Sequence, residues 1–210
     1  MKPLIVAATI PEIAILIANF NLHEKEFIQS PEFDILITGV GMTATAFALG
    51  KHLSPKYNLV LNLGIAGSFD RSLSLGTVVN ITTDEFAELG ADDKTHFISI
   101  DELGFGKSKY SAYNNLLNDH ITQLKKVNGI TVNRVNGSEE SIKSITDRLN
   151  PTTESMEGAA VLYCCEQTST PCLQIRSISN YVEPRNRENW NIGLAIKNLN
   201  NWAIGFLTNT

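Results

Sequence analysis

The sequence predicts an α/β fold in which a central sheet lies between two layers of helices. The short continuous apolar run at residues 4–8 is typical of a strand that is covered on both faces, and residues 33–38 and 59–63 predict two further strands. Segments with helical spacing follow such runs, and the clearest of them spans residues 192–206. Strands that alternate with helices favour a three-layer αβα architecture with a mixed sheet, in which ligands bind at the carboxyl ends of the strands.

Length and charge narrow the class of protein. A chain of 210 residues is long enough for one domain with a full core, so we expect a single domain over residues 1–210. The 17 Lys and Arg residues are outnumbered by 22 Asp and Glu residues. A surface without a basic surplus does not attract a phosphate backbone, and we therefore expect no nucleic acid partner.

The three cysteines fit no disulfide framework. Cys164 and Cys165 are adjacent, and Cys172 leaves the number odd. Reduced thiols in a cytoplasmic protein are the simplest interpretation. No apolar stretch reaches the roughly 18 residues that a membrane span needs, so we expect no membrane partner. The four histidines share no metal-ligand spacing, and we expect neither a metal nor a cofactor.

The first two strands are each followed by a helix start. Thr9 and Pro11 indicate that a helix begins directly after the first strand, which puts Glu12 at the carboxyl end of that strand. Residues 39–44 match the dinucleotide pattern G-x-G-x-x-G/A, but the next strand offers Asn62 where that site needs an acidic residue. We expect these glycines to bring backbone amides close to the ribose of a substrate or to an anion.

The middle of the chain is less regular. Residues 64–67 are predicted to turn directly after the third strand, and their small side chains would let a flat ring lie against the backbone. Residues 76–82 predict another strand. The long stretch from there to about residue 109 is predicted to be irregular, which makes it a candidate substrate loop.

The second half of the chain predicts helical segments at residues 113–124, after Ser138, near Glu157 and in the last segment. Strands are predicted at residues 130–135 and 172–178, and the second of these ends at Asn180. A helix that begins near Glu157 would draw this carboxylate inward with its small and apolar neighbours. A buried carboxylate needs a partner, and the cis-diol of a ribose would supply one. The alternative is a first-turn glutamate that only favours the helix dipole.

Four separated motifs occur in a recognisable order: residues 7–12, 38–41, 62–67 and the pair 155–160 and 176–180. Together they resemble the purine nucleoside phosphorylase and nucleosidase superfamily, and most closely its futalosine hydrolase branch. The resemblance covers nearly the whole chain and implies the nucleoside phosphorylase/nucleosidase-like fold.

The resemblance also implies roles for individual residues. Glu12 stands where these hydrolases have the carboxylate that activates water, and Asn180 stands where a residue faces the purine ring and serves the departing base. The implied substrate-binding residues are Gly41, Ala66, Gly67, Met156, Glu157 and Ser179, with the Met156–Glu157 pair on the ribose.

The implied activity is hydrolysis of futalosine to hypoxanthine and dehypoxanthinyl futalosine, a step of menaquinone biosynthesis, by a homodimer whose partner is a small nucleoside. Alternatives are a methylthioadenosine/S-adenosylhomocysteine nucleosidase, a purine nucleoside phosphorylase, and a nucleoside-binding protein without chemistry. No arginine precedes Arg71, so the glycine-rich segment lacks the cationic phosphate site that a phosphorylase needs. The presence of Glu12 argues against a pure binding protein.

Two further expectations concern substrate choice. The resembling methylthioadenosine nucleosidases have Asp where this chain has Asn180. The amide of Asn180 can donate to an oxygen at position 6 of a purine and can accept from a protonated N7. This pairing suits hypoxanthine. Arg185 and Arg187 are candidates for binding the distal carboxylate of futalosine, or they form a solvated pair. Asn186 stands where the family tends to have Asp, which leaves the orientation of both arginines open.

Overall fold

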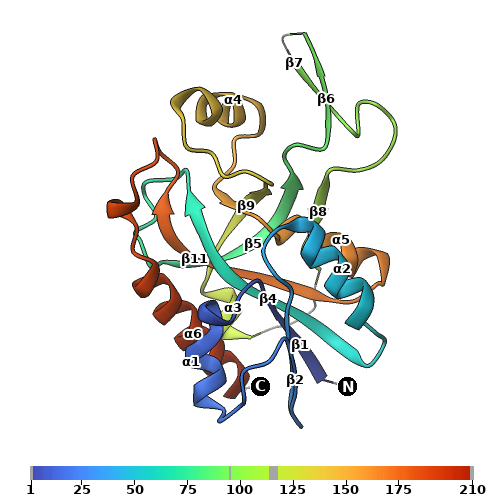
Figure 1. Ribbon diagram of the computed structural model, residues 1–210, viewed down its shortest axis with the longest axis vertical. Helices are drawn as coiled ribbons and strands as arrows, with labels where there is room; N and C mark the ends of the chain where they lie inside the picture. The colour runs from blue at the N-terminus through green and yellow to red at the C-terminus, as the bar shows by residue number, and fades with distance from the viewer. Residues whose placement is uncertain (1, 95, 114–117, 209–210) are drawn as a thin grey trace.

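The computed structural model describes residues 2–94, 96–113 and 118–208, and within them a mixed sheet forms the centre of the molecule (Figure 1). Its strand order is β10-β9-β5-β11-β4-β1-β3-β2, and β8 pairs with β5. The strands are β1 (Lys2–Ala7), β2 (Phe27–Gln29), β3 (Asp34–Ile37), β4 (Tyr57–Ser68), β5 (Val78–Phe86), β8 (Lys109–Ser111), β9 (Lys125–Thr131), β10 (Thr153–Ser155) and β11 (Cys172–Tyr181).

Helices cover both faces of this sheet. The helices are α1 (Ile10–Asn19), α2 (Met42–His52), α3 (Asp119–Thr122), α4 (Glu139–Leu149), α5 (Gly158–Gln167) and α6 (Ile192–Thr208), with a short 3-10 turn η1 (Arg187–Asn189). Alternate residues of β1 show the two faces: Ile5 packs in the core cluster of α1 and α6, whereas Leu4 and Val6 pack in that of α2 and α5. The predicted three-layer αβα fold is confirmed.

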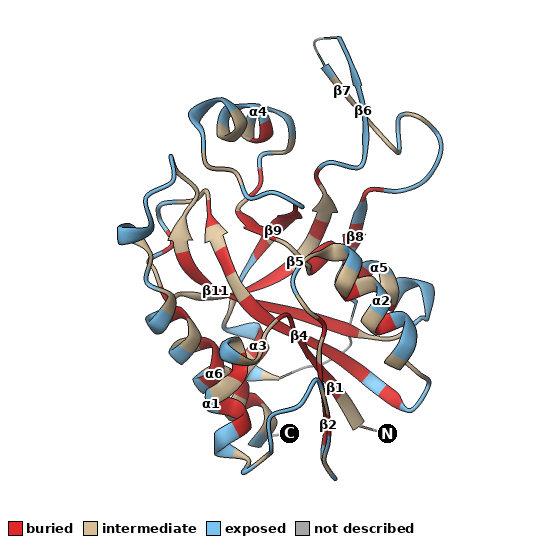
Figure 2. Ribbon diagram, in the orientation of Figure 1, coloured by how far each residue is buried: buried red, intermediate tan, exposed pale blue. Residues whose placement is uncertain are grey.

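Burial follows this layering. The central strands β1, β4 and β11 are almost wholly buried, whereas the outer faces of the helices are exposed (Figure 2). Within the described residues, no helix is long and apolar enough to cross a membrane. The carboxyl ends of parallel strands β1, β4 and β11 therefore form the part of the sheet that is open to a ligand.

Helix α1 is interrupted three residues after its start, and a side chain from the other end of the chain fills the break. Ile13 has non-helical angles (φ −126°, ψ 18°). The amide of Asn200, a fully buried residue of α6, accepts from Leu16 N (2.8 Å) and donates to Glu12 O (2.8 Å). A regular helix would join these two groups by one direct hydrogen bond, so the side chain of Asn200 bridges the missing bond.

We predict that Asn200→Ala destabilises the protein. The substitution leaves Leu16 N and Glu12 O without the partner they have in the native fold, and each unpaired buried group costs about 1–3 kcal/mol. The free energy of unfolding, measured by urea denaturation, should fall by about 2 kcal/mol or more. Asn201→Ala, an exposed neighbour on the same helix, is the matched control. A loss below about 0.5 kcal/mol, the usual range of surface substitutions, would contradict this account.

Some predicted boundaries are wrong. Residues 64–67 do not form a turn, because β4 continues to Ser68 and pairs with β11 along this segment, with β10 joining on the other side at Gly67 and Ser68. Strand β5 likewise continues to Phe86, beyond the predicted residue 82. Long-range pairing keeps both segments extended where their glycines and polar residues favour turns.

The stretch that follows β5 is partly regular. Two short strands, β6 (Gly90–Asp93) and β7 (His96–Ser99), form an antiparallel hairpin that projects beyond the main sheet (Figure 1). The predicted helix 113–124 is reduced to α3, and part of its predicted span lies outside the described residues. The predicted strand 130–135 is β9, which ends at Thr131. The N-cap at Ser138 is confirmed, since its hydroxyl accepts from Ser141 N.

Candidate active site

A cleft of about 400 Å³ opens at the carboxyl ends of β1, β4 and β11. It brings together eight of the predicted site residues: Glu12, Ala66, Gly67, Met156, Glu157, Ser179, Asn180 and Arg185. Gly41 lies beside the cleft and contacts one of its carboxylates, as described below. Arg187 is not among the residues that line it.

The carboxylate of Glu12 is held on both oxygens. Its Oε2 accepts from the backbone N (3.0 Å) and the hydroxyl (2.9 Å) of Thr9, the residue that caps α1. Its Oε1 accepts from the backbone N of Ile65 on β4 (3.3 Å). Burial raises the pKa of Glu12, although the positive charge of Arg176 and the bond from Thr9 act in the opposite direction. The result is an oriented carboxylate that binds a proton more readily than a solvated glutamate.

Arg176 is a site residue that the sequence analysis missed. It lies on β11, is only 2% exposed, and its Nη1 donates to Asn62 Oδ1 (3.3 Å). A Cβ placed on Gly64 would lie 3.1 Å from Arg176 Nη1 and 3.2 Å from Glu12 Oε1. The absence of a side chain at Gly64 therefore lets the guanidinium and the carboxylate meet over the backbone of β4. A buried arginine inside an apolar strand gives no pattern that reveals its partner in advance.

We predict that Glu12→Gln lowers turnover by about 10²- to 10⁴-fold while substrate binding persists, because the amide keeps the shape but cannot take a proton. The raised pKa of Glu12 should shift the acid limb of the activity profile to higher pH than a solvated glutamate would give, because protonation removes the base. Single-turnover kinetics across the acid range measure both effects. A variant with near-normal turnover would contradict the prediction that Glu12 takes a proton during the reaction.

Glu157 is the N-cap of α5, and its side chain reaches the glycine-rich segment. Its Oε1 accepts from Gly41 N (2.9 Å). Gly39 and Gly41 have φ angles of +82° and +95°, which side chains disfavour, so glycine is required to turn this amide toward the cleft. The sequence analysis expected Glu157 to be buried, but the side chain is half-buried. The buried carboxylate of this segment is that of Glu154, which is 5% exposed.

The position of Glu157 depends on how closely α5 approaches the sheet. A Cβ on Gly158 would overlap Asp84 Oδ2 and Gln174 Nε2. The hydroxyl of Thr131 donates to Asp84 Oδ1 (2.9 Å) and accepts from Ala159 N (2.7 Å). A buried carboxylate thus secures the first turn of the helix through one hydroxyl group. Burial raises the pKa of Asp84 to about 6.

Asn180 and Ser179 form the opposite wall. The hydroxyl of Ser179 donates to Asn180 Oδ1 (2.8 Å) and also lies 3.2 Å from Ala66 O. Asn180 Nδ2 donates to Tyr181 O (3.0 Å). These bonds hold the amide plane, while the carbonyl oxygen keeps a second lone pair and the nitrogen a second hydrogen. The amide can therefore accept one hydrogen bond from a ligand and donate another.

The two arginines differ in their relation to the cleft. The guanidinium of Arg185 lies 5.2 Å from the ring centroid of Trp190, and both side chains line the cleft. Arg187 lies 5.8 Å from the same ring but does not line the cleft. Among the described residues, no group of three or more His, Cys, Asp or Glu side chains could hold a metal ion.

Comparison with known proteins shows which proteins this chain is similar to. A futalosine hydrolase of Streptomyces coelicolor is 29% identical over 184 residues, which are 83% of this chain and 78% of that protein. A 5′-methylthioadenosine/S-adenosylhomocysteine nucleosidase of Psychromonas ingrahamii is 30% identical over 202 residues, 86% of each chain. The crystal structure of futalosine hydrolase from Helicobacter pylori has the same fold, with a TM-score of 0.84, 18% identity, and coverage of 100% of this chain and 98% of that chain.

The family model of the phosphorylase superfamily matches residues 28–205, which is well over half of the chain. Its match confirms the predicted family and fold, and with them the prediction of an enzyme. The relatives carry two different names, futalosine hydrolase and nucleosidase, at nearly equal identity. The chain belongs to the phosphorylase superfamily.

Proposed function

We propose that this protein is an N-ribosyl hydrolase that cleaves the bond between a purine and its ribose. The observation that carries the proposal is the meeting of Glu12, Glu157 and Asn180 around one cleft of about 400 Å³. They supply a carboxylate for water, a carboxylate for the sugar hydroxyls and an amide for the base. The names of the relatives support the same class of reaction.

The three side chains fit the needs of glycosidic cleavage. The C1′–N9 bond breaks with its electron pair moving to the purine, and the sugar passes through an oxocarbenium-like state. Glu12 takes a proton from water, whose oxygen bonds to C1′. Glu157 accepts hydrogen bonds from the ribose hydroxyls, and its negative charge favours the cationic sugar. N7 takes a proton from solvent as the bond breaks, and Asn180 accepts a hydrogen bond from this N7–H, which stabilises the departing base.

We propose futalosine as the substrate, with hypoxanthine and dehypoxanthinyl futalosine as products in menaquinone biosynthesis. The amide of Asn180 supports a base that carries an oxygen at position 6, because its NH₂ group can donate there. Two relatives beyond the one from Streptomyces are also named futalosine hydrolase. The second candidate, a methylthioadenosine/S-adenosylhomocysteine nucleosidase, is supported by relatives of that name.

A phosphorylase is the third candidate, and Arg176 is the cation that could support it. Its guanidinium faces the carboxylate of Glu12, however, and is 2% exposed. A phosphate ion in the same place would meet a negative charge at Glu12. Water is therefore the better-supported nucleophile.

One assay separates these candidates. The purified protein is incubated with futalosine, inosine and methylthioadenosine, without and with phosphate, and the released base and sugar are identified. We expect hypoxanthine from futalosine at a rate independent of phosphate, and little adenine from methylthioadenosine. Hydrolysis of methylthioadenosine as fast as futalosine would favour the second candidate, and a dependence on phosphate would favour the third.

We predict that Glu157→Ala weakens the discrimination between ribonucleosides and 2′-deoxyribonucleosides. Loss of a charged acceptor should cost about 1.5–3 kcal/mol for each hydrogen bond to the sugar. The measurement is kcat/KM for inosine and 2′-deoxyinosine. Glu166→Ala, an exposed glutamate at the other end of α5, is the control. An unchanged ratio would count against contact between Glu157 and the 2′-hydroxyl.

The distal carboxylate of futalosine tests the two arginines. We propose Arg185 as its partner, because Arg185 lines the cleft whereas Arg187 does not. Arg185→Met should raise KM for futalosine more than for inosine, which lacks the carboxylate, and Arg187→Met should have a smaller effect. An equal loss on both substrates in each variant would show that neither arginine binds this carboxylate.

We also propose a homodimer in the cytoplasm. Large apolar side chains are exposed on and beside α2, where Val40 lines the cleft and is 56% exposed and Phe47 is 75% exposed. A second copy on this face would bury both. The three cysteines form no disulfide within the described residues, which agrees with a reducing compartment. A monomer in light scattering at micromolar concentration would contradict the dimer.

A further inference from the structure

Glu154 lies in line with the residue that faces the base, although no role was expected for it. It is the middle residue of β10 and pairs with Gly67 on β4. Gly67 pairs on its other side with Asn180 on β11. Three neighbouring strands therefore place Glu154, Gly67 and Asn180 in one row.

The side chains at the two ends of this row share one face of the sheet. Residues paired across neighbouring strands point to the same side, and a Cβ on Gly67 would lie 3.1 Å from Asn180 Nδ2. Strands are about 4.7–4.9 Å apart, so the backbones at Glu154 and Asn180 are separated by roughly 10 Å. The absence of a side chain at Gly67 lets the amide of Asn180 and the side chain of Val182 lie close over this part of β4. Glu154, Gly67 and Asn180 line both the cleft and a smaller hollow that adjoins it.

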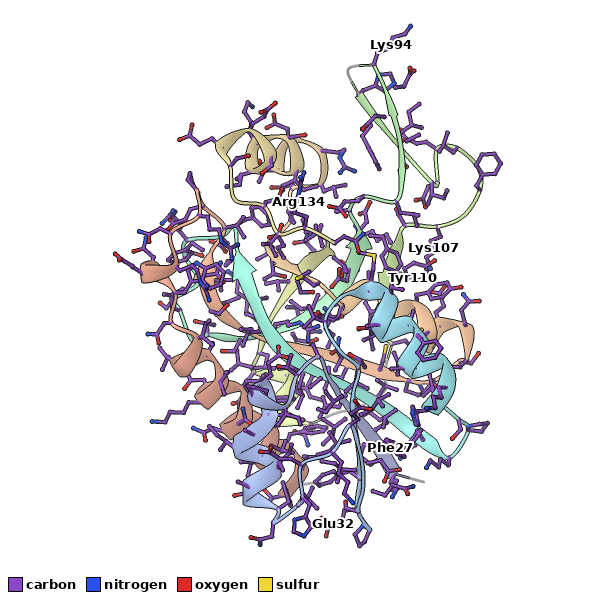
Figure 3. All side chains as sticks on the ribbon, viewed as in Figure 1. Phe27, Glu32, Lys94, Lys107, Tyr110 and Arg134 are labelled. Atoms are coloured by element: carbon purple, nitrogen blue, oxygen red, sulfur yellow. The ribbon has the colours of Figure 1, made fainter. Side chains whose placement is uncertain are left out.

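The carboxylate of Glu154 is oriented by neutral groups. Its Oε1 accepts from Asn136 N (3.0 Å), and its Oε2 accepts from the side-chain amide of the same residue. Asn136 lies in the loop between β9 and α4 that also carries Arg134, which is labelled in Figure 3. Each oxygen accepts one bond from Asn136 and can accept another from a ligand.

Burial governs the protonation of this group. It raises the pKa of Glu154 to about 7, with a further increase from the charge of Glu88 and a decrease from the bonds of Asn136. The other charged side chains around the smaller hollow are Glu183 and Arg185, on the segment after β11. The residues paired with Glu154, Ile130 of β9 and Gly67 of β4, carry no charge. Both protonation states of Glu154 are therefore populated near neutral pH.

We propose that Glu154 is a specificity-determining residue that binds position 1 of the purine, opposite Asn180 at position 6. The inference rests on the proposed function, which places the base beside Asn180. Hypoxanthine presents an N1–H donor next to its 6-oxygen, whereas adenine presents an N1 lone pair next to its amino group. The ionised carboxylate can accept from N1–H of hypoxanthine, but it meets a lone pair on adenine. The protonated carboxyl can instead donate to N1 of adenine.

Base preference should consequently change with pH. The ionised fraction of a group with a pKa of about 7 rises roughly tenfold between pH 6 and pH 8. The protonated fraction falls by the same factor, so the ratio of hypoxanthine to adenine affinity should rise by up to about a hundredfold in the wild-type protein. Glu154→Gln, whose amide remains a donor at every pH, should remove this dependence. It should also lower the ratio of hypoxanthine to adenine affinity by about tenfold or more, because one hydrogen bond to a charged group is lost.

Calorimetric titration with free hypoxanthine and free adenine at pH 6 and pH 8 tests the inference without requiring turnover. Glu183→Gln is the matched control: it removes a carboxylate of the same hollow that is not in line with Gly67, and it should keep the wild-type pH dependence. If Glu154→Gln binds the bases with unchanged preference and unchanged pH dependence, the inference is overturned but the proposed function is not. Wild-type protein that binds neither base would overturn the proposed function as well.

A second variant keeps the inference testable if Glu154→Gln does not fold. Asn136→Ala removes the side-chain hydrogen bond to Glu154 Oε2 and keeps the backbone bond to Oε1. The lost bond favours the ionised carboxylate, so the pKa of Glu154 should rise. The pH at which base preference changes should then move upward relative to wild type. An unmoved midpoint would assign the pH dependence to another group and overturn the inference.

Discussion

The approach of α5 to the sheet is the constraint on which the cleft depends, and it exists only because residue 158 has no side chain. Glycine there allows the first turn of the helix to lie directly over Asp84 and Gln174. The carboxylate of Asp84 is fully enclosed, so it needs the bonds from Thr131 and Gln174 to remain charged. Any larger residue at position 158 would lift the helix and carry Glu157 away from the glycine-rich segment.

The carboxylates around the cleft show how one side-chain type acquires different properties from its partners. Glu12 shares its surroundings with the buried cation of Arg176, whereas Glu154 is bonded only by the neutral amide groups of Asn136. Burial raises the pKa of both groups, but in Glu12 a positive charge opposes that effect. The cleft can thus hold one carboxylate suited to taking a proton from water and another that responds to pH near neutrality.

Much of the site could be predicted from the sequence because its residues follow strands directly. Glu12 follows β1, and Asn180 is the second-to-last residue of β11, so the rule for strand ends places both at one edge of the sheet. Glu157 joins them at the start of a helix. Arg176 could not be found in this way. It lies inside β11, where a buried charge is recognisable only once the fold shows that Glu12 faces it.

The role of Glu154 depended on information that local patterns do not contain. Its alignment with Gly67 and Asn180 is a matter of register between three strands that are far apart in the chain. The same pairing explains why residues 64–67, which have the composition of a turn, are a strand. Among the described residues of the predicted helix at 113–124, only Asp119–Thr122 are helical, because tertiary contacts override spacing in a short segment.

Asn200 makes the native geometry around Glu12, the carboxylate proposed to activate water, depend on when α6 folds. The break in α1 directly after Glu12 is completed by an amide that is 188 residues further along the chain. During synthesis, β1 and α1 leave the ribosome long before α6, so the native geometry around Glu12 cannot be reached while Asn200 is still inside the exit tunnel. A newly made chain therefore reaches the native geometry around Glu12, the carboxylate proposed to activate water, only when α6 docks against α1.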